Sequence, residues 1–148
     1  MHIITGNYSG TRGKFVLYNF IKATKMADIS PEKIAIYRKT AQERLERERG
    51  EIEQRKEKAW AAARRAASLL KEQFHATRVV VFGSLVHESS FTRWSDVDIA
   101  AWGIPSEDTF RAIGAVMDME TPVEVNLVDV NTCRPSILES IKKEGVDL

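Results

Sequence analysis

Two short polar motifs stand at the ends of apolar runs in the middle of the chain. Gly83 and Ser84 follow the run VVVF, and Asp96 and Asp98 open the run DVDIA after eleven intervening residues. Residues two apart on a strand point to the same face, so a strand here projects both carboxylates together. Two like charges this close need a positive charge between them, and magnesium prefers oxygen ligands. The spacing predicts a cation site; the alternative is that Asp96 caps a turn and only Asp98 lies on the strand.

The Gly-Ser pair indicates a phosphate site beside these carboxylates. Glycine lets the backbone approach a ligand closely, and oriented backbone amides bind anions. The start of a short helix after the pair would add partial positive charge. Phosphate on one side and metal-binding carboxylates on the other suit phosphoryl or nucleotidyl transfer.

The elements that must position these motifs alternate between strand and helix patterns. β-Branched and apolar runs predict strands at 76–82, 96–102 and 123–130, and helical spacing predicts helices at 106–119 and 134–145. From residue 59 the predicted order is α, β, short α, β, α, β, α. This order is typical of an α/β (α+β) domain with helices packed against a small sheet.

A long charged helix is expected before the first strand. Ser30, Pro31 and Glu32 provide a hydroxyl N-cap, a proline in the first turn and an acid near the helix N-terminus. Good helix formers continue to Phe74. Gly50 is the one residue of low helix propensity, at which the helix could divide into two. Residues 46–58 contain only Ile52 as an apolar residue, which predicts a solvated helix or a surface against a partner.

These patterns divide the chain into three parts. We expect an N-terminal extension at 1–29, a charged helical arm at 30–58 and the α/β domain at 59–148. The sequence from Met26 looks like a natural beginning, so we expect that residues 1–25 are an upstream or non-native extension. The alternative is an ordinary N-terminal arm. The exposed helical arm makes a homo-oligomer plausible.

Composition narrows the classes of partner and compartment. The chain has 148 residues, with 22 basic against 21 acidic side chains, which gives no reason to expect direct nucleic-acid binding. Its single cysteine, Cys133, excludes an internal disulfide and fits a reducing cytoplasm. No apolar run approaches the ~20 residues of a membrane span, so we expect no membrane partner.

The stretch RVVVFGSLVHESSFTRWSDVDIAAWGIP resembles the minimal nucleotidyltransferases of the DNA polymerase β-like superfamily, whose hallmark is a GS pair followed by DxD. The resemblance covers roughly residues 59–148. It implies the small mixed sheet of the nucleotidyltransferase fold. It implies that Gly83 and Ser84 bind the phosphates of ATP, and that Asp96 and Asp98 hold magnesium, with two ions expected. Arg93 could reach the triphosphate, although an ordinary surface role is the alternative.

The chain departs from the family pattern at the third acidic position. Where the family's last strand usually reads like VDLVDL, this chain reads VNLVDV and places Asn126 at the site. Asparagine can offer a carbonyl oxygen to a metal but cannot accept a proton. Glu124 lies two residues earlier, on the same face by strand alternation, and could act as base or ligand. The other interpretation is that the third position has decayed and the domain only binds nucleotide, or binds nothing.

The resemblance implies transfer of AMP from ATP to an acceptor hydroxyl. The smallest family members resemble antitoxins that adenylylate a tyrosine of a HEPN-type toxin, and we expect such a toxin as partner. One alternative is a binding module that neutralises its partner by contact alone. Another is a small-molecule nucleotidyltransferase of the aminoglycoside-modifying kind.

Overall fold

The computed structural model describes residues 29–148. The expected N-terminal extension and the proposed start at Met26 lie outside the described residues, except for Ile29. Within residues 29–148, no helix combines the length and the apolar character that a membrane crossing requires.

The first described element is the long helix α2 (Pro31–Gln73). Ser30 caps its start, since the Ser30 Oγ accepts a hydrogen bond from the Lys33 N–H at 3.4 Å. The helix continues through Gly50, so this weak point does not end it. One glycine costs only about 1 kcal/mol relative to alanine, which strong helix formers on both sides can offset.

The chain divides into two units, Met1–Glu46, of which residues 29–46 are described, and Arg47–Leu148. Helix α2 contributes residues 31–46 to the first unit and 47–73 to the second. Along residues 31–46 nearly every side chain is exposed, including the large apolar residues Ile36, Tyr37 and Leu45. This part of α2 therefore presents an exposed surface that includes large apolar side chains.

The second unit contains a four-stranded mixed sheet with the strand order β3-β2-β1-β4. Its strands are β1 (Arg78–Phe82), β2 (Val97–Trp102), β3 (Val125–Asp129) and β4 (Val146–Asp147). β1 pairs antiparallel with β2 and with β4, while β2 and β3 are parallel. The predicted small mixed sheet flanked by helices is confirmed. The two-residue strand β4 was not predicted.

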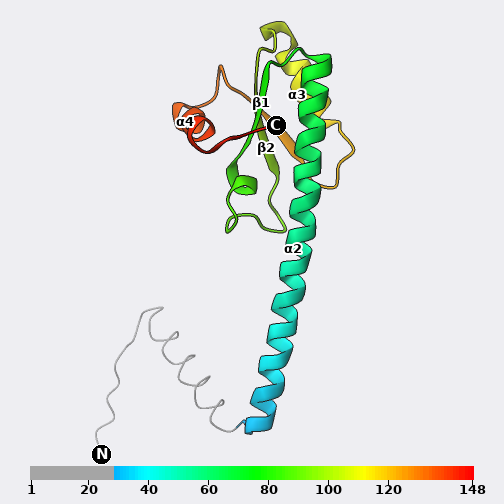
Figure 1. Cartoon of the computed structure of the whole chain (residues 1–148), viewed down its shortest axis with the longest axis vertical. Coiled ribbons are helices and arrows are strands. Elements are labelled where there is room, and N and C mark those ends of the chain that lie inside the picture. Colours follow the sequence, from blue (N-terminus) through cyan, green and yellow to red (C-terminus); the bar gives the residue numbers. More distant parts are fainter. Residues whose placement is uncertain (1–28) are drawn as a thin grey trace, which may run out of the picture. The chain divides into compact units, whose positions relative to one another are not determined.

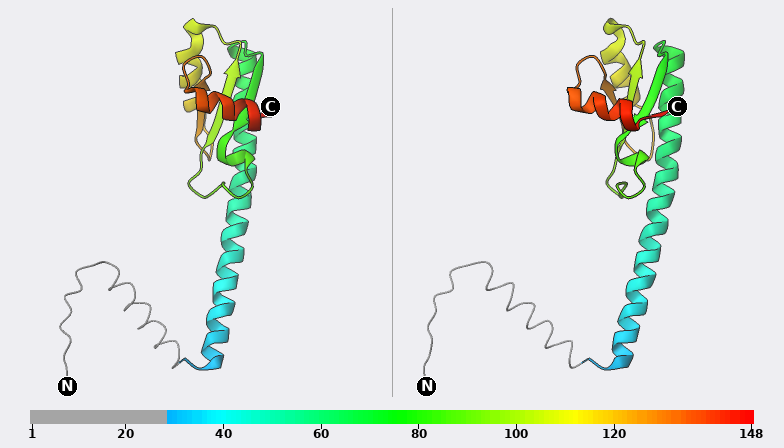
Figure 2. Two further views of the ribbon diagram at one scale, coloured as in Figure 1. Left: turned by 90° about the vertical axis from the view of Figure 1, so that its left-hand side faces the viewer. Right: turned by 60° about the vertical axis from the view of Figure 1, so that its left-hand side comes forward.

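The two faces of the sheet are covered by different helices. Val79 and Val81 of β1 pack into the core beneath α2, whereas Val80 and Phe82 pack with Ile141 of α4 (Pro135–Glu144). Helix α3 (Thr109–Met117), after the 3-10 turn η2 (Ser106–Asp108), joins the core on the side of α2. Within this unit, α2 runs alongside the strands and α4 lies across them on the opposite side (Figures 1 and 2).

Small side chains let α2 approach the sheet closely. The residues of α2 buried in the core are five alanines and one leucine: Ala59, Ala62, Ala63, Ala66, Ala67 and Leu70. Ala59, Ala63, Ala66 and Leu70 recur every three or four positions, which places them on one helix face. Burial against a β-branched sheet surface, rather than helix propensity alone, then stabilises this half of α2.

An ion pair fastens the last strand to the sheet. The Arg78 Nε donates to the Asp147 Oδ1 at 2.6 Å and the Arg78 Nη2 donates to the Asp147 Oδ2 at 3.1 Å. The guanidinium also lies 5.0 Å from the ring centre of Trp102. The hydrogen bond from Arg78 lowers the pKa of the Asp147 carboxyl below its usual range.

This ion pair predicts a pH-dependent contribution to stability. Because the folded-state pKa of Asp147 is lowered, its contribution is present above the unfolded pKa of about 3.9 and is lost as the pH falls through the folded pKa. We therefore expect Asp147→Asn to lower the Tm at pH 7 and to have little effect at pH 2. Calorimetry at both pH values measures these Tm differences. Glu43→Gln is the control, because Glu43 forms an exposed ion pair on α2. An equal Tm difference at both pH values would contradict the prediction.

Candidate functional site

The strand register brings the Gly-Ser and Asp-Val-Asp motifs into contact. In the β1–β2 pair, Phe82 stands opposite Asp98, so Gly83 follows directly beside the Asp98 side chain. Gly83 has a φ of +77°, and a Cβ placed on it would lie 3.1 Å from the Asp98 Oδ2. The glycine thus meets two requirements at once, a left-handed backbone and close approach to a carboxylate.

A side chain at position 83 should disturb both the turn and the carboxylate. Gly83→Ala is expected to cost about 1–2 kcal/mol of stability through its left-handed conformation, and to displace the Asp98 Oδ2. Chemical denaturation measures the first effect and Mn²⁺ titration the second. Gly114→Ala in α3 is the matched control, because nothing lies within 4 Å of its added Cβ and alanine favours a helix. A Gly83→Ala protein as stable as the wild type, with unchanged Mn²⁺ affinity, would refute the prediction.

The two aspartates flank a fully buried residue at the start of β2. Asp96 directly precedes the strand and Asp98 lies within it; both side chains are partly buried. Val97 between them and Ile99 after them are fully buried in the core under α2. The turn before β2 is closed by other residues: the Thr92 N–H donates to the Ser95 Oγ at 2.9 Å and the Trp94 N–H to the Thr92 Oγ1 at 3.2 Å.

Asn126 of β3 stands opposite Asp98 in the parallel register. Burial raises the pKa of the Asp98 carboxyl, a hydrogen bond from the Asn126 side chain opposes that rise, and the charge of Asp96 adds to it. Asn126 therefore faces Asp98 across the β2–β3 pair, and its amide favours the ionised form of the carboxyl.

The donor set fits a magnesium ion bound together with substrate phosphates. Burial and the nearby Asp96 charge disfavour ionised Asp98, and a divalent cation would offset both effects. Magnesium is commonly held by one or two carboxylates and substrate phosphates, with water completing its shell. Among residues 29–148, no group of three His, Cys, Asp or Glu side chains is placed to hold a metal. Any ion at Asp96 and Asp98 therefore depends on those two carboxylates, with Asn126 beside them.

Glu124 is near the site through its backbone. Its carbonyl oxygen accepts a hydrogen bond from the Val97 N–H at 2.9 Å, which extends the β2–β3 pairing. Glu124 is exposed and lines a hollow together with Val116 and Met117 of α3. The described lining of that hollow does not include Asp96 or Asp98.

The remaining predicted residues lie in the segments that frame the site. Ser84 is partly buried in the 3-10 turn η1 (Gly83–Val86), whose leading N–H groups lack partners within the turn. Arg93 is exposed, with its Nη2 3.9 Å from the Glu48 Oε1 of α2. Its neighbour Trp94 is 83% exposed, an unusual position for a large aromatic side chain.

Sequence reasoning missed one residue at the site. Arg55 of α2 donates from its Nη2 to the Ser95 carbonyl oxygen at 3.0 Å, immediately before Asp96. The charged stretch 46–58 predicted a solvated face or a partner surface, and Arg55 was not distinguished within it. Its spacing from Ile52 and Ala59 places the three on one helix face, and this signal could have singled it out.

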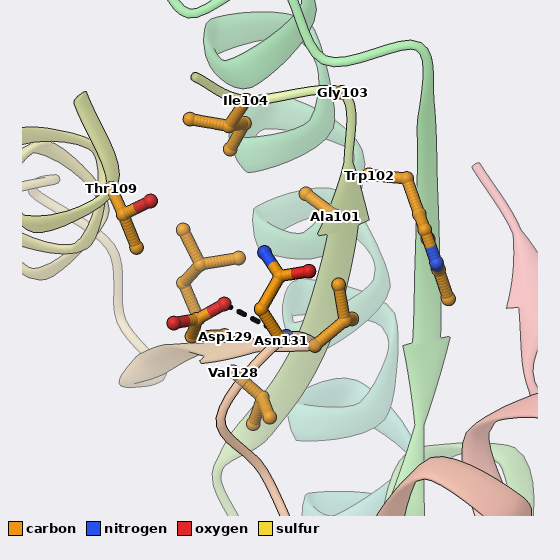
Figure 3. A pocket seen from close by; sticks show the side chains of 10 residues that line it. Ala101, Trp102, Gly103, Ile104, Thr109, Val128, Asp129 and Asn131 are labelled. Carbon is orange, nitrogen blue, oxygen red and sulfur yellow. Dashed lines mark hydrogen bonds between the residues drawn. The ribbon is translucent and has the colours of Figure 1, made fainter. Parts of the chain in front are cut away.

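The opposite end of β2 and β3 holds a small cavity with a structural role for Asp129. The cavity, of about 60 Å³, lies beside Gly103, Thr109 and Asp129 (Figure 3). The Asp129 carboxylate accepts hydrogen bonds from the Asn131 N–H and the Thr132 hydroxyl, both at 3.0 Å. Asp129 therefore closes the turn after β3, away from the Asp96–Asp98 end of the strands.

The sequence matches no family model and no curated protein. Among solved structures, a crystal structure of a mutant of the toxin-antitoxin MntA-HpeT is 19% identical, with 57% of this chain and 69% of that chain covered and a TM-score of 0.45. A second mutant of MntA-HpeT is 16% identical, with 57% and 70% covered and a TM-score of 0.45.

A third similar structure is a toxin-antitoxin with AMP-PNP, 19% identical, with 55% of this chain and 67% of that chain covered and a TM-score of 0.44. All identities are below 20% and all TM-scores below 0.5. Likenesses this distant carry no argument about the function of this chain.

Proposed function

We propose that the protein is a magnesium-dependent nucleotidyltransferase that moves AMP from ATP to a hydroxyl of a protein partner. The observation that carries this proposal is the contact between Gly83 and Asp98 across the β1–β2 register. It sets a turn suited to binding phosphates directly against a pair of carboxylates suited to binding magnesium.

Each residue of the site has a distinct role in the proposal. Backbone N–H groups of η1 and the Ser84 hydroxyl bind the triphosphate, and Gly83 leaves room for it. Asp96 and Asp98 hold the metal, and Asn126, opposite Asp98 in the register, favours the ionised form of Asp98. Bound magnesium would supply positive charge against the charge that develops during phosphoryl transfer.

The transfer forms one bond at phosphorus and breaks another, and the acceptor hydroxyl loses its proton. The acceptor oxygen bonds to the α-phosphorus of ATP, and the bond from that phosphorus to the pyrophosphate oxygen breaks. The acceptor proton is released to water in this scheme, because Asn126 cannot accept it and Glu124 lines the hollow beside α3. Catalysis then depends mainly on positioning and charge stabilisation.

A protein acceptor suits the limited enclosure of the site. The second unit, Arg47–Leu148, consists of one small sheet and its covering helices, so a small acceptor would meet few walls. A protein acceptor brings its own surface. In keeping with the resemblance of the sequence, we propose a tyrosine of a HEPN-type toxin as the acceptor, with this chain acting as antitoxin.

Transfer of label from α-labelled ATP tests the proposal. Purified protein and labelled ATP are incubated in three mixtures. The first contains magnesium alone, the second contains magnesium and the protein encoded by the neighbouring gene, and the third contains both plus EDTA. We expect label on the partner, detected as an AMP adduct by mass spectrometry and abolished by EDTA. Label on an aminoglycoside without a protein acceptor would instead support a small-molecule enzyme.

A second candidate function is neutralisation by contact. Asn126 favours it, because a site with two carboxylates and an amide lacks a third acid among the described residues. Such a protein would neutralise its partner without ATP. Absence of label, together with full neutralisation in EDTA, would favour this candidate.

A further inference from the structure

Arg55 ties helix α2 to the peptide that carries Asp96. Its Nη2 lies 3.0 Å from the carbonyl oxygen of Ser95. Because a peptide bond is planar, this carbonyl shares a rigid unit with the nitrogen and Cα of Asp96. A hydrogen bond to the Ser95 oxygen therefore restricts the position of the Asp96 Cα, from which the side chain extends.

The peptide on the other side of Asp96 is held as well. The Val97 N–H donates to the Glu124 carbonyl oxygen at 2.9 Å. Asp96 precedes the strand, yet both peptide planes that meet at its Cα are hydrogen-bonded, one to α2 and one to the residue before β3. Of these two contacts, only the one from Arg55 is made by a side chain, so substitution can remove it.

Packing holds the guanidinium of Arg55 in place. Its Nε is buried, without a hydrogen-bond partner in the described part of the chain. Arg55 lines a hollow with Pro122 and Val123, which lead into β3. A side chain enclosed in this way keeps fewer rotamers than a solvated arginine, so its contact with Ser95 is pre-organised.

We propose that Arg55 is a positioning residue for the Asp96–Asp98 metal site. The inference rests on the proposed function and deepens it. Arg55 does not touch the substrate: it holds the Ser95 carbonyl, and with it the backbone from which Asp96 reaches the metal. Residues that orient metal ligands typically change metal affinity by about 10–100-fold when removed.

Helix α2 supplies a matched control for this inference. Arg65 donates from its Nη1 to the Glu120 carbonyl oxygen at 2.9 Å, an arginine–carbonyl contact of nearly equal length. It joins the same helix to a loop of the same unit, but at a residue outside the Asp96–Asp98 motif. Arg65→Met thus removes a comparable bond without touching the site.

The test measures Mn²⁺ binding by electron paramagnetic resonance, with and without AMP-PNP, in full-length wild type and variants. Arg55→Met, which keeps an unbranched stem but no donor, should weaken Mn²⁺ affinity about tenfold or more. Arg65→Met should stay within about twofold of wild type, since it leaves both carboxylates and their supports in place. Amide hydrogen exchange at Val97, whose N–H is bonded to the Glu124 carbonyl oxygen, should accelerate in Arg55→Met alone.

A second variant covers the case in which Arg55→Met fails to fold. Arg55→Lys retains a charged donor and should keep Mn²⁺ affinity closer to wild type than any neutral substitution does. Unchanged Mn²⁺ affinity and exchange in Arg55→Met, or in Arg55→Gln where Arg55→Met does not fold, overturn the inference. With a wild type that binds Mn²⁺, this outcome leaves the proposed function standing. A wild type that does not bind Mn²⁺ even with AMP-PNP overturns the proposed function, and the inference with it.

Discussion

The double substitution Asp96→Asn with Asp98→Asn is expected to reduce AMP transfer about a thousandfold or more while the protein stays folded. Removing both carboxylates removes the charge that holds the metal, and electrostatic stabilisation of this kind is commonly worth about 10²–10³ for a single group. The amide side chains have nearly the same shape as the carboxylates they replace. The loss should therefore be chemical rather than structural.

The pKa of Asp98 determines whether the same double substitution raises or lowers stability. Burial and the charge of Asp96 raise the pKa of Asp98 in the folded state, so its ionisation weakens the metal-free fold. When the pKa of an acid is higher in the folded state, the folded protein keeps the proton up to a higher pH. The free energy of unfolding therefore falls as the pH rises from the unfolded-state pKa to the folded-state pKa. We expect the metal-free double variant to be at least as stable as the wild type at pH 7.

Calorimetry and label transfer on the same samples make the prediction decisive. Magnesium with AMP-PNP should raise the Tm of the wild type and leave that of the double variant unchanged. A variant that still labels the partner would refute the assignment of the site. A variant that neutralises the partner as well as wild type, where wild type transfers no label, would favour the binding module.

The local parts of this site could be predicted from the sequence because they depend on short-range periodicity. Alternation along DVDIA predicted that both carboxylates share one face, and in the structure both are partly buried while Val97 and Ile99 are fully buried. The β-branched run before Gly83 likewise forms β1. A period of two is a property of any strand and requires no knowledge of its neighbours.

The contacts between elements could not be predicted in the same way. The pairs Phe82–Asp98 and Asp98–Asn126 depend on strand register, which is set when the whole sheet assembles. Arg55 is separated from Ser95 by 40 positions, and its charge made it look like the solvated residues around it. Strand β4 was missed because two residues carry no periodic pattern.

The substitution Asn126→Asp is expected to raise the transfer rate and to destabilise the metal-free protein. Asn126 stands opposite Asp98 and favours its ionised form, whereas aspartate at this position would add a third negative charge. The pKa of Asp98 would then rise further, and the metal-free fold would lose stability near neutral pH. With metal bound, the added carboxylate becomes a ligand or a base, and a positioned base contributes about 10²–10⁴-fold in rate.

Three measurements on Asn126→Asp separate these effects: the Tm without metal should fall, the Mn²⁺ affinity should rise, and the rate of label transfer should increase about a hundredfold. Asn131→Asp is the control, since it introduces the same charge beside Asp129, beyond the far end of β3. If both variants behave alike, Asn126 has no special relation to the metal. If Asn126→Asp binds Mn²⁺ more tightly without faster transfer, then proton removal does not limit the reaction, and the natural asparagine costs the enzyme only metal affinity.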